Sequence, residues 1–300
     1  MINIKIYRNH LLLLGAGFSF STLAVFSEIA TRLHVDGFNQ MIWRTIFAAI
    51  LSIIAAIGVY KQHIQISNLQ LKYLLINACL FVGGITTFSL GIYLGSPIAK
   101  AVALNYAYPL IVILLSYIFF KETPSIKGWV ATFLSLLSVS LLLEIWTINN
   151  FFSLNVGDML ELLNSVFFGA MIVYGKKIRN EAELHPFAIL SYSYLFTIPL
   201  LFALGFLLMN VFHMDAIGVP IRVLTFEQYL SLFGLALFGM VVPMSLIYAG
   251  VSKIRAHIAG ILLLTEPLWV YVFGMLLFQQ NLSFWGIMGI IGIVISVILV

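Results

Sequence analysis

The chain has 300 residues, of which 62% are hydrophobic and 9% charged, with a mean hydropathy of +1.09 and a formal net charge of +4. Soluble domains carry about 25% charged residues, so this composition excludes a soluble globular protein. The basic residues are scattered at the ends of apolar segments instead of clustering on one face, and this distribution excludes a nucleic-acid-binding surface.

Apolar runs close to the ~20 residues that cross a bilayer recur from one end of the chain to the other. The first run follows basic residues as in a signal peptide, but no small-residue cleavage site follows it, so we predict an uncleaved span. The expected fold is an all-α integral membrane protein with ten transmembrane helices. We place these helices at residues 11–30, 39–60, 71–94, 97–120, 126–146, 157–175, 186–211, 227–250, 255–278 and 283–300.

Lysine and arginine residues are distributed unequally between the two sides of this topology. With a cytoplasmic N-terminus, only Arg32, Lys100 and Arg222 fall on the far side, and Arg44 lies inside the second span. The sequence therefore predicts a multi-pass protein of the cell membrane (plasma or inner membrane) with both termini cytoplasmic. The basic residues on the cytoplasmic side are Lys5, Arg8, Lys61, Lys72, Lys121, Lys127, Lys176, Lys177, Arg179, Lys253 and Arg255.

The second half of the chain repeats the first. Residues 109–142 align without gaps on residues 267–300, at an offset of 158, with nine identities in 34 positions. We expect a first five-helix repeat at residues 1–146 and a second at residues 157–300, integrated in one membrane domain. Because five is an odd number, the second repeat enters the membrane from the opposite side, an inverted arrangement that is typical of transporters.

Motifs in both halves carry a resemblance to a known family. The first half contains GIYLGSPIAKAVALNYAYPL and FFKETPSIKGW, and the second contains IYAGVSKIRAHIAGILLLTEPLW and FQQNLSFWG. Together with an arginine early in the second span, in MIWRTIFAAI, they resemble the EamA-type transporters of the drug/metabolite transporter superfamily over nearly the whole chain. The chain departs from this pattern at two places. The first half has Tyr108 at the position where the second half has Glu266, and the second half has Gln280 at the position where the first half has the acid Glu122.

Two prolines are predicted to bend matching helices near the middle of the membrane. Glu266 and Pro267 lie about eleven residues into the ninth span, which is ~16 Å deep in a ~30 Å hydrocarbon core, and Pro109 lies at a similar depth in the fourth. A proline leaves the carbonyl four residues back without its usual donor. The carbonyls of Asn105 and Leu263 should therefore face protein or a water-filled cavity.

Three roles are open for Glu266. A carboxylate at this depth costs roughly 2.5–3.5 kcal/mol on insertion scales, so the side chain should face a hydrated cavity or hold a proton. It could pair with a substrate ammonium, carry a coupling proton, or be a neutral structural acid that is hydrogen-bonded to a neighbouring helix.

Other polar and aromatic side chains at middle depth are candidates for the wall of a substrate cavity. Tyrosines offer an apolar face and a hydroxyl, which suits a small amphipathic ligand. Packing between helices, or a hydrogen bond to the residue's own backbone, would explain the same side chains without a ligand. In addition to Glu266, the candidates are Tyr93 and Tyr248 at matching places in the two halves, Asn105 and Tyr108 next to the first kink, Trp269, Ser19 and Asn164.

Arg44 lies about one turn inside its span and needs a partner there. We predict a structural or gating ion pair with an acid at the outer end of a helix, such as Glu28. Glu144 and Glu161 are also placed near outer ends, where they would pair with Arg32, Arg44 or Arg222 or extend to the interface.

The leading functional interpretation is a secondary transporter, an exporter or exchanger of small metabolites such as amino acids or related amphipathic solutes, working by alternating access without ATP. No phosphate-binding G-x-x-x-x-G-K-[ST] loop is present, and enzyme motifs such as H-E-x-x-H and G-x-S-x-G are missing. The alternative is a lipid flippase or a membrane partner subunit. The expected partners are a small-molecule substrate, the lipid bilayer and a coupling proton, with the protein a monomer or homodimer.

We expect no cofactor and no metal. The histidines lie near predicted helix ends or in loops and lack the spacing of metal ligands. They are His10, His34, His63, His185, His213 and His257.

Overall fold

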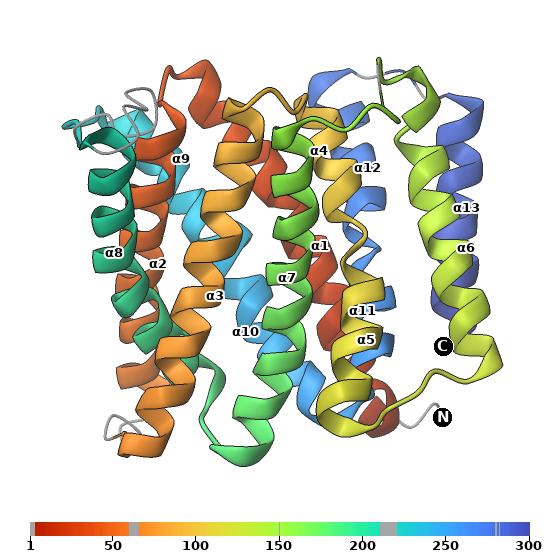
Figure 1. The fold of residues 1–300 in the computed structure, drawn as a ribbon, viewed down its shortest axis with the longest axis horizontal. Helices are drawn as coiled ribbons and strands as arrows, with labels where there is room; N and C mark the ends of the chain where they lie inside the picture. The colour runs from red at the N-terminus through yellow and green to blue at the C-terminus, as the bar shows by residue number, and fades with distance from the viewer. Residues whose placement is uncertain (1–3, 60–65, 150, 211–220, 280, 282) are drawn as a thin grey trace.

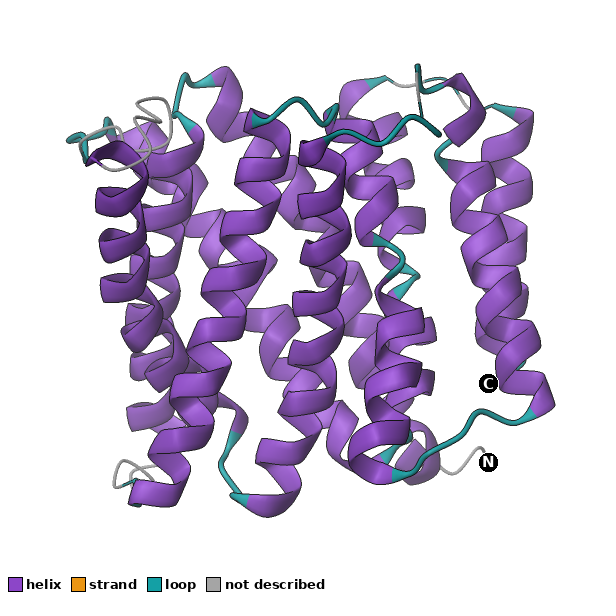
Figure 2. Cartoon of the chain, in the orientation of Figure 1, coloured by secondary structure: helices purple, strands orange, loops and turns teal. Residues whose placement is uncertain are grey.

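The computed structural model describes residues 4–59, 66–149, 151–210, 221–279, 281 and 283–300. These residues form an upright bundle of helices joined by short connections, with no strand among them (Figures 1 and 2). The helices are α1 (Ile4–Arg32), α2 (Gly37–Val59), α3 (Asn68–Tyr93), α4 (Ile98–Asn105), α5 (Tyr108–Phe120), α6 (Ile126–Leu142), α7 (Val156–Glu181), α8 (Pro186–Asn210), α9 (Phe226–Ala236), α10 (Val242–Gly250), α11 (Ala256–Leu263), α12 (Glu266–Phe278) and α13 (Phe284–Ile298).

Each predicted span coincides with an apolar helix or a pair of consecutive helices. In the described part of the chain, eight of these segments are long and apolar enough to cross a membrane, and α6 and α13 are shorter apolar helices. The fold is therefore an all-helical, multi-pass membrane protein. The predicted span ends at residues 60 and 211 lie outside the described residues.

Several helices begin where a short polar side chain can satisfy the free backbone N–H groups of the first turn. Ser67, Asn155 and Thr225 each accept a hydrogen bond from the backbone three residues later, and the residue there bonds back to the cap. This reciprocal capping fixes the starts of α3, α7 and α9.

The repeat is visible in the backbone as well as in the sequence. α4 and α11 have eight residues each, α5 and α12 have thirteen, and each pair is offset by 158. Both α5 and α12 end on a residue in the left-handed conformation, Lys121 and Gln279, each with φ of 55°. Ser125 and Ser283 then cap the next helices by accepting from glycine N–H groups. The two halves thus share local structure around the proline motif.

The prolines interrupt their helices instead of kinking them. Two turn residues separate α4 from α5 and α11 from α12, and Pro109 and Pro267 lie in the first turns of α5 and α12. This corrects the prediction of a bent but continuous helix. A proline in the first turn of a helix leaves no hydrogen bond unmade, because the N–H at that position has no intrahelical partner.

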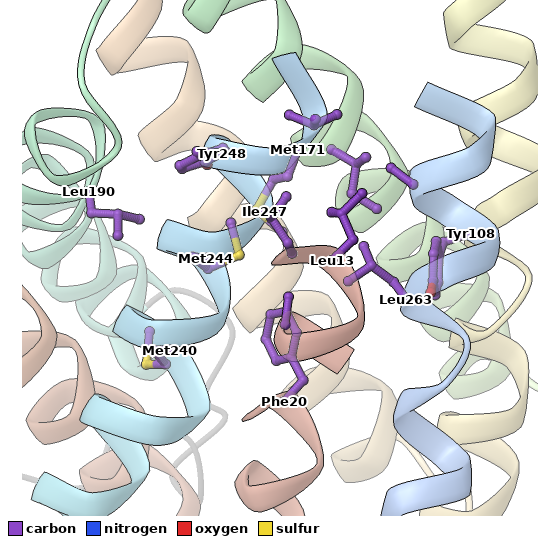
Figure 3. Packing of buried hydrophobic residues seen from close by; sticks show 14 of the residues in the cluster. Leu13, Phe20, Tyr108, Met171, Leu190, Met240, Met244, Ile247, Tyr248 and Leu263 are labelled. Carbon is purple, nitrogen blue, oxygen red and sulfur yellow. The ribbon is translucent and has the colours of Figure 1, made fainter. Parts of the chain in front are cut away.

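The two halves pack closely against each other. α1 contacts α10, α11 and α12 of the second half, α3 packs on α7, and α6 pairs with α13 at one edge of the bundle (Figure 1). A buried apolar cluster fills the middle between α1, α7, α10 and α11, with Leu13, Met171, Ile247 and Leu263 among its members (Figure 3). The start of α1 and the end of α13 lie toward the same end of the molecule (Figure 1).

Candidate functional site

The helix breaks of the two repeats face each other. Glu266 is the first residue of α12, where the helix dipole favours a negative charge. Tyr106 lies in the break between α4 and α5 and is buried, and its hydroxyl lies close enough to the carboxyl of Glu266 for the two groups to interact. The break of one repeat therefore places a polar group beside the acid in the break of the other.

Tyr108 occupies the position in the first repeat that Glu266 occupies in the second. Its side chain is fully buried, its ring packs edge-on against Phe168 at 4.8 Å between centroids, and its hydroxyl donates to the carbonyl of Gly260 at 3.3 Å. The N–H of Leu264 bonds to the carbonyl of Ile261 at the break. The hydroxyl of Tyr108 therefore supplies a hydrogen-bond donor to a carbonyl in the last turn of α11, close to the break.

A cavity of about 380 Å³ lies between α1, α4, α6 and α12. Tyr106 and Pro267, the residues at the two breaks, line it together with apolar side chains such as Val102 and Val270. Glu28 and Arg32, near the end of α1, are the charged residues of its wall. This volume is in the range of sites for small molecules, and an apolar wall with few polar groups is typical of them.

A second polar cluster joins α3, α8 and α10. The side-chain amide of Asn77 donates to Ser193 at 2.8 Å and to the hydroxyl of Tyr248 at 3.0 Å, and all three side chains are fully buried. Tyr194 is also fully buried, and its hydroxyl has no hydrogen-bond partner among the described residues. The sequence pointed to Tyr248 but not to Asn77, whose only signal was an amide inside an apolar run.

Tyr93 and Tyr248, predicted at matching places in the two halves, lie in different surroundings. Tyr93 ends α3 and is 45% exposed, whereas Tyr248 lies within α10 and is buried. This is a correction of the expectation that both line one cavity. Four residues lie between Tyr93 and the start of α4, but seven lie between Tyr248 and the start of α11, so the two tyrosines do not occupy equivalent positions in the two repeats.

The remaining predicted cavity residues are placed as follows. Asn105 ends α4 beside the break, and its side-chain oxygen is buried without a partner among the described residues. Trp269 packs edge-on against Phe18 at 5.0 Å between centroids. Asn164 is buried on α7, one turn from the Phe168 ring that contacts Tyr108.

Ser19 has a structural role at a distortion in the second half. Its hydroxyl donates at 2.5 Å to the carbonyl of Phe238, which lies in a five-residue π-helical segment between α9 and α10. Pro243 in the first turn of α10 lacks the N–H that would continue a regular α-helix across this point. Ser19 therefore holds α1 against the distorted turn, a contact that no local signal in the sequence revealed.

The predicted ion pair between Arg44 and Glu28 is absent. Glu28 pairs instead with Arg32, one turn along the same helix, at 2.8 Å. Within the described ranges Arg44 has no acid within 4.0 Å, its Nε is buried without a partner, and Tyr194 lies near its guanidinium. Neighbours on one helix face meet without any tertiary constraint, which is why the local pair forms.

Two ion pairs that the sequence did not predict fasten α7 at both ends. At the upper end in Figure 1, Lys100 at the start of α4 donates to Asp158 at 2.6 Å, and both side chains are buried. At the lower end, Lys176 pairs with Glu122, whose other oxygen accepts from the backbone N–H of Ala256 at 3.0 Å. These contacts hold α7 to the start of α4 at one end, and to the end of α5 and the start of α11 at the other.

Glu161 was predicted to lie near the outer end of its helix, either paired with an arginine or extending to the interface, and it does neither. It is completely buried on α7, and neither of its carboxyl oxygens has a hydrogen-bond partner in the described part of the chain. The same part contains no group of three metal-ligating side chains. His63, His213 and Gln280 lie outside the described residues.

A comparison with protein families matches the EamA-like transporter family twice, at residues 8–144 and 155–300. The chain belongs to the EamA-like transporter family. The predicted resemblance is confirmed, and the chain has the two-repeat architecture of the family. This EamA-like protein is therefore a membrane protein of a family of transporters, built from two tandem repeats.

A solved structure, described only as the crystal structure of a protein, shares the fold of this EamA-like chain. The TM-score is 0.77, at 16% sequence identity, over 97% of this chain and 96% of the other. A comparison with curated proteins returned no match. The structural likeness supports the architecture and not a substrate, because identity this low speaks for the fold alone.

Proposed function

We propose that this EamA-like protein is a secondary transporter that exports or exchanges small metabolites, such as amino acids or related amphipathic solutes, by alternating access. The observation that carries the proposal is the facing pair of helix breaks, with Glu266 close to Tyr106 and a cavity of about 380 Å³ lined by Tyr106 and Pro267. Broken helices that meet between two repeats are how many secondary transporters build their substrate site.

The topology in this proposal has ten spans in two inverted five-helix repeats. α6 and α13, the shorter apolar helices, would complete the repeats at matching positions, 158 residues apart at their first residues. The excess of lysine and arginine on one side favours cytoplasmic termini in a plasma or inner membrane. An odd number of spans per half supports the inversion.

The substrate preference follows from the wall of the cavity. Apolar side chains and the Tyr106 ring suit the hydrocarbon part of a solute, and the carboxyl of Glu266 beside Tyr106 suits an ammonium group. An amino acid or an amine satisfies both requirements. In this assignment Glu266 is the substrate-binding acid, because its carboxyl lies close to Tyr106 and its neighbour Pro267 lines the cavity.

Counterflow uptake in proteoliposomes tests this function. Labelled amino acids and the amines derived from them would be offered to wild type and to Glu266→Gln. We expect saturable counterflow of at least one of them, reduced about tenfold or more in the variant, since a charge-assisted hydrogen bond contributes about 1.5–3 kcal/mol.

Glu227→Gln is the matched control, because Glu227 is an exposed acid in the first turn of α9. If Glu266→Gln and the control both transport like wild type, Glu266 is a structural acid. If wild type moves no solute but scrambles a fluorescent phospholipid, the flippase alternative replaces the transporter; the mostly apolar wall of the cavity is the observation that favours that alternative.

A further inference from the structure

Asp158 and Glu161 are the two fully buried acids among the described residues, and of these two Glu161 alone lacks a hydrogen-bond partner there. Its side chain has 0% exposure, and neither carboxyl oxygen has a hydrogen-bond partner there. An ionised carboxylate in such surroundings costs several kcal/mol or more, whereas the protonated form avoids that cost. In this arrangement of the helices, Glu161 must therefore hold a proton.

The neighbouring charges do not offer Glu161 a counter-ion. Asp158, one turn earlier on α7, takes the charge of Lys100 at 2.6 Å and accepts from Ser96 at 2.8 Å and from the backbone of Asn155 at 2.8 Å. Lys100 also donates to the carbonyl of Ser153 at 2.9 Å. Among the described residues no cation forms an ion pair with Glu161, and Tyr93, which ends the neighbouring helix α3, is 45% exposed.

The seal around Glu161 depends on a close approach of α3 to α7. A side chain at Gly91 on α3 would collide with the carboxyl of Glu161, and one at Gly157 on α7 would collide with the carbonyl of Gly91. Two glycines therefore let the helices close over the acid. Any movement that separates the ends of α3 and α7 would expose this carboxyl to water.

We propose that Glu161 is the site at which this transporter binds its coupling proton. The carboxyl group holds the proton while α3 and α7 are closed, and it releases the proton to water, leaving a carboxylate, when the two helices separate. The Lys100–Asp158 pair holds the same end of α7 to α4, so the state of Glu161 is tied to the opening of that end. The inference rests on the transport function proposed above, and it assigns the proton to Glu161 and the substrate to Glu266.

Proteoliposomes that hold wild type or Glu161→Gln test the proposal, with Glu227→Gln as the exposed-acid control. The probe is whichever labelled amino acid or amine gives the strongest wild-type counterflow. Counterflow at equal pH and uptake against a concentration gradient under an imposed pH gradient are both measured. We expect Glu161→Gln to keep counterflow within about twofold, because glutamine copies the shape of the protonated acid, and to lose the pH-driven accumulation.

Outcomes against the proposal differ from outcomes against the transport function. Counterflow without any response to the pH gradient in wild type, or an unchanged response in Glu161→Gln, would overturn the proton site and leave the transporter standing. Absence of all wild-type counterflow would overturn the transporter, and the proton site with it. If Glu161→Gln does not fold, Glu161→Asp is used, which keeps the titrating group. Coupled uptake with a displaced pH profile supports the site, and an unchanged profile contradicts it.

Discussion

At the residue scale, the two helix breaks differ by one side chain at equivalent positions, since Glu266 stands where the first repeat has Tyr108. Both residues contact the opposite repeat. The carboxyl of Glu266 lies close to the hydroxyl of Tyr106, and the hydroxyl of Tyr108 donates to the carbonyl of Gly260. The substitution of a phenol for an acid leaves one carboxyl beside the cavity and gives the other break a buried, neutral contact.

Tyr108→Phe should destabilise the folded protein by about 1 kcal/mol, because it removes one hydrogen bond and leaves a buried carbonyl without that donor. Thermal unfolding of the purified protein in detergent would measure the change. Tyr117→Phe on the same helix is the control, since Tyr117 is 52% exposed and should lose almost nothing. Equal unfolding temperatures for both variants would contradict the assigned role of the Tyr108 hydroxyl.

At the element scale, proline decides where the helices are interrupted. The first turn of a helix needs no hydrogen bond from its own N–H groups, so Pro109 and Pro267 allow new helices to begin in the middle of longer apolar segments. The same argument applies to Pro243, which follows the π-helical segment held by Ser19. In the described part of the second half, the π-helical segment and the break between α11 and α12 both lie in elements that contact α1.

Pro267→Ala should slow counterflow about tenfold while raising the stability of the protein or leaving it unchanged. Alanine restores the N–H and favours a continuous helix, which removes the polar break and the hinge that alternating access requires. Pro186→Ala, at the first residue of α8, is the control and should transport like wild type. Unaltered transport in Pro267→Ala would show that the break is not part of the transport cycle.

At the scale of the whole molecule, α7 connects the broken helices of both repeats. Lys100 and Asp158 hold its upper end to α4, and Lys176 and Glu122 hold its lower end beside α5 and α11. Ion pairs at opposite ends of one helix are suited to closing the two sides of a transporter, provided that they open in turn. A buried pair of this kind is strongly destabilised when only one partner is removed.

Lys100→Met alone should destabilise the protein by about 3–5 kcal/mol, because the Asp158 carboxylate is left buried without its cation. Adding Asp158→Asn to the same chain should recover part of this loss, since no unpaired charge then remains. A double-mutant cycle of unfolding in detergent measures the coupling between the two side chains. Additive effects of the two substitutions would contradict a direct interaction.

Much of this protein could be predicted from its sequence, and the limits have a physical cause. Hydropathy placed the spans, and the proline motif located both breaks and Asn105, because these features depend on neighbours along the chain. The assignment of Arg44 to Glu28 was wrong, and Tyr93 and Tyr248, predicted at matching places, differ sharply in exposure. Those predictions concerned contacts between helices, and a single sequence contains no register between distant segments.

The sequence by itself determined the all-helical membrane architecture, the duplication and the acid beside the second proline. The tertiary structure alone decided which side chains meet across helices. It paired Lys100 with Asp158 and Lys176 with Glu122, and it buried Glu161 without a partner. Spans and breaks follow from transfer into hydrocarbon and from local hydrogen bonding, whereas these contacts depend on how α7 packs against α3, α4 and α5.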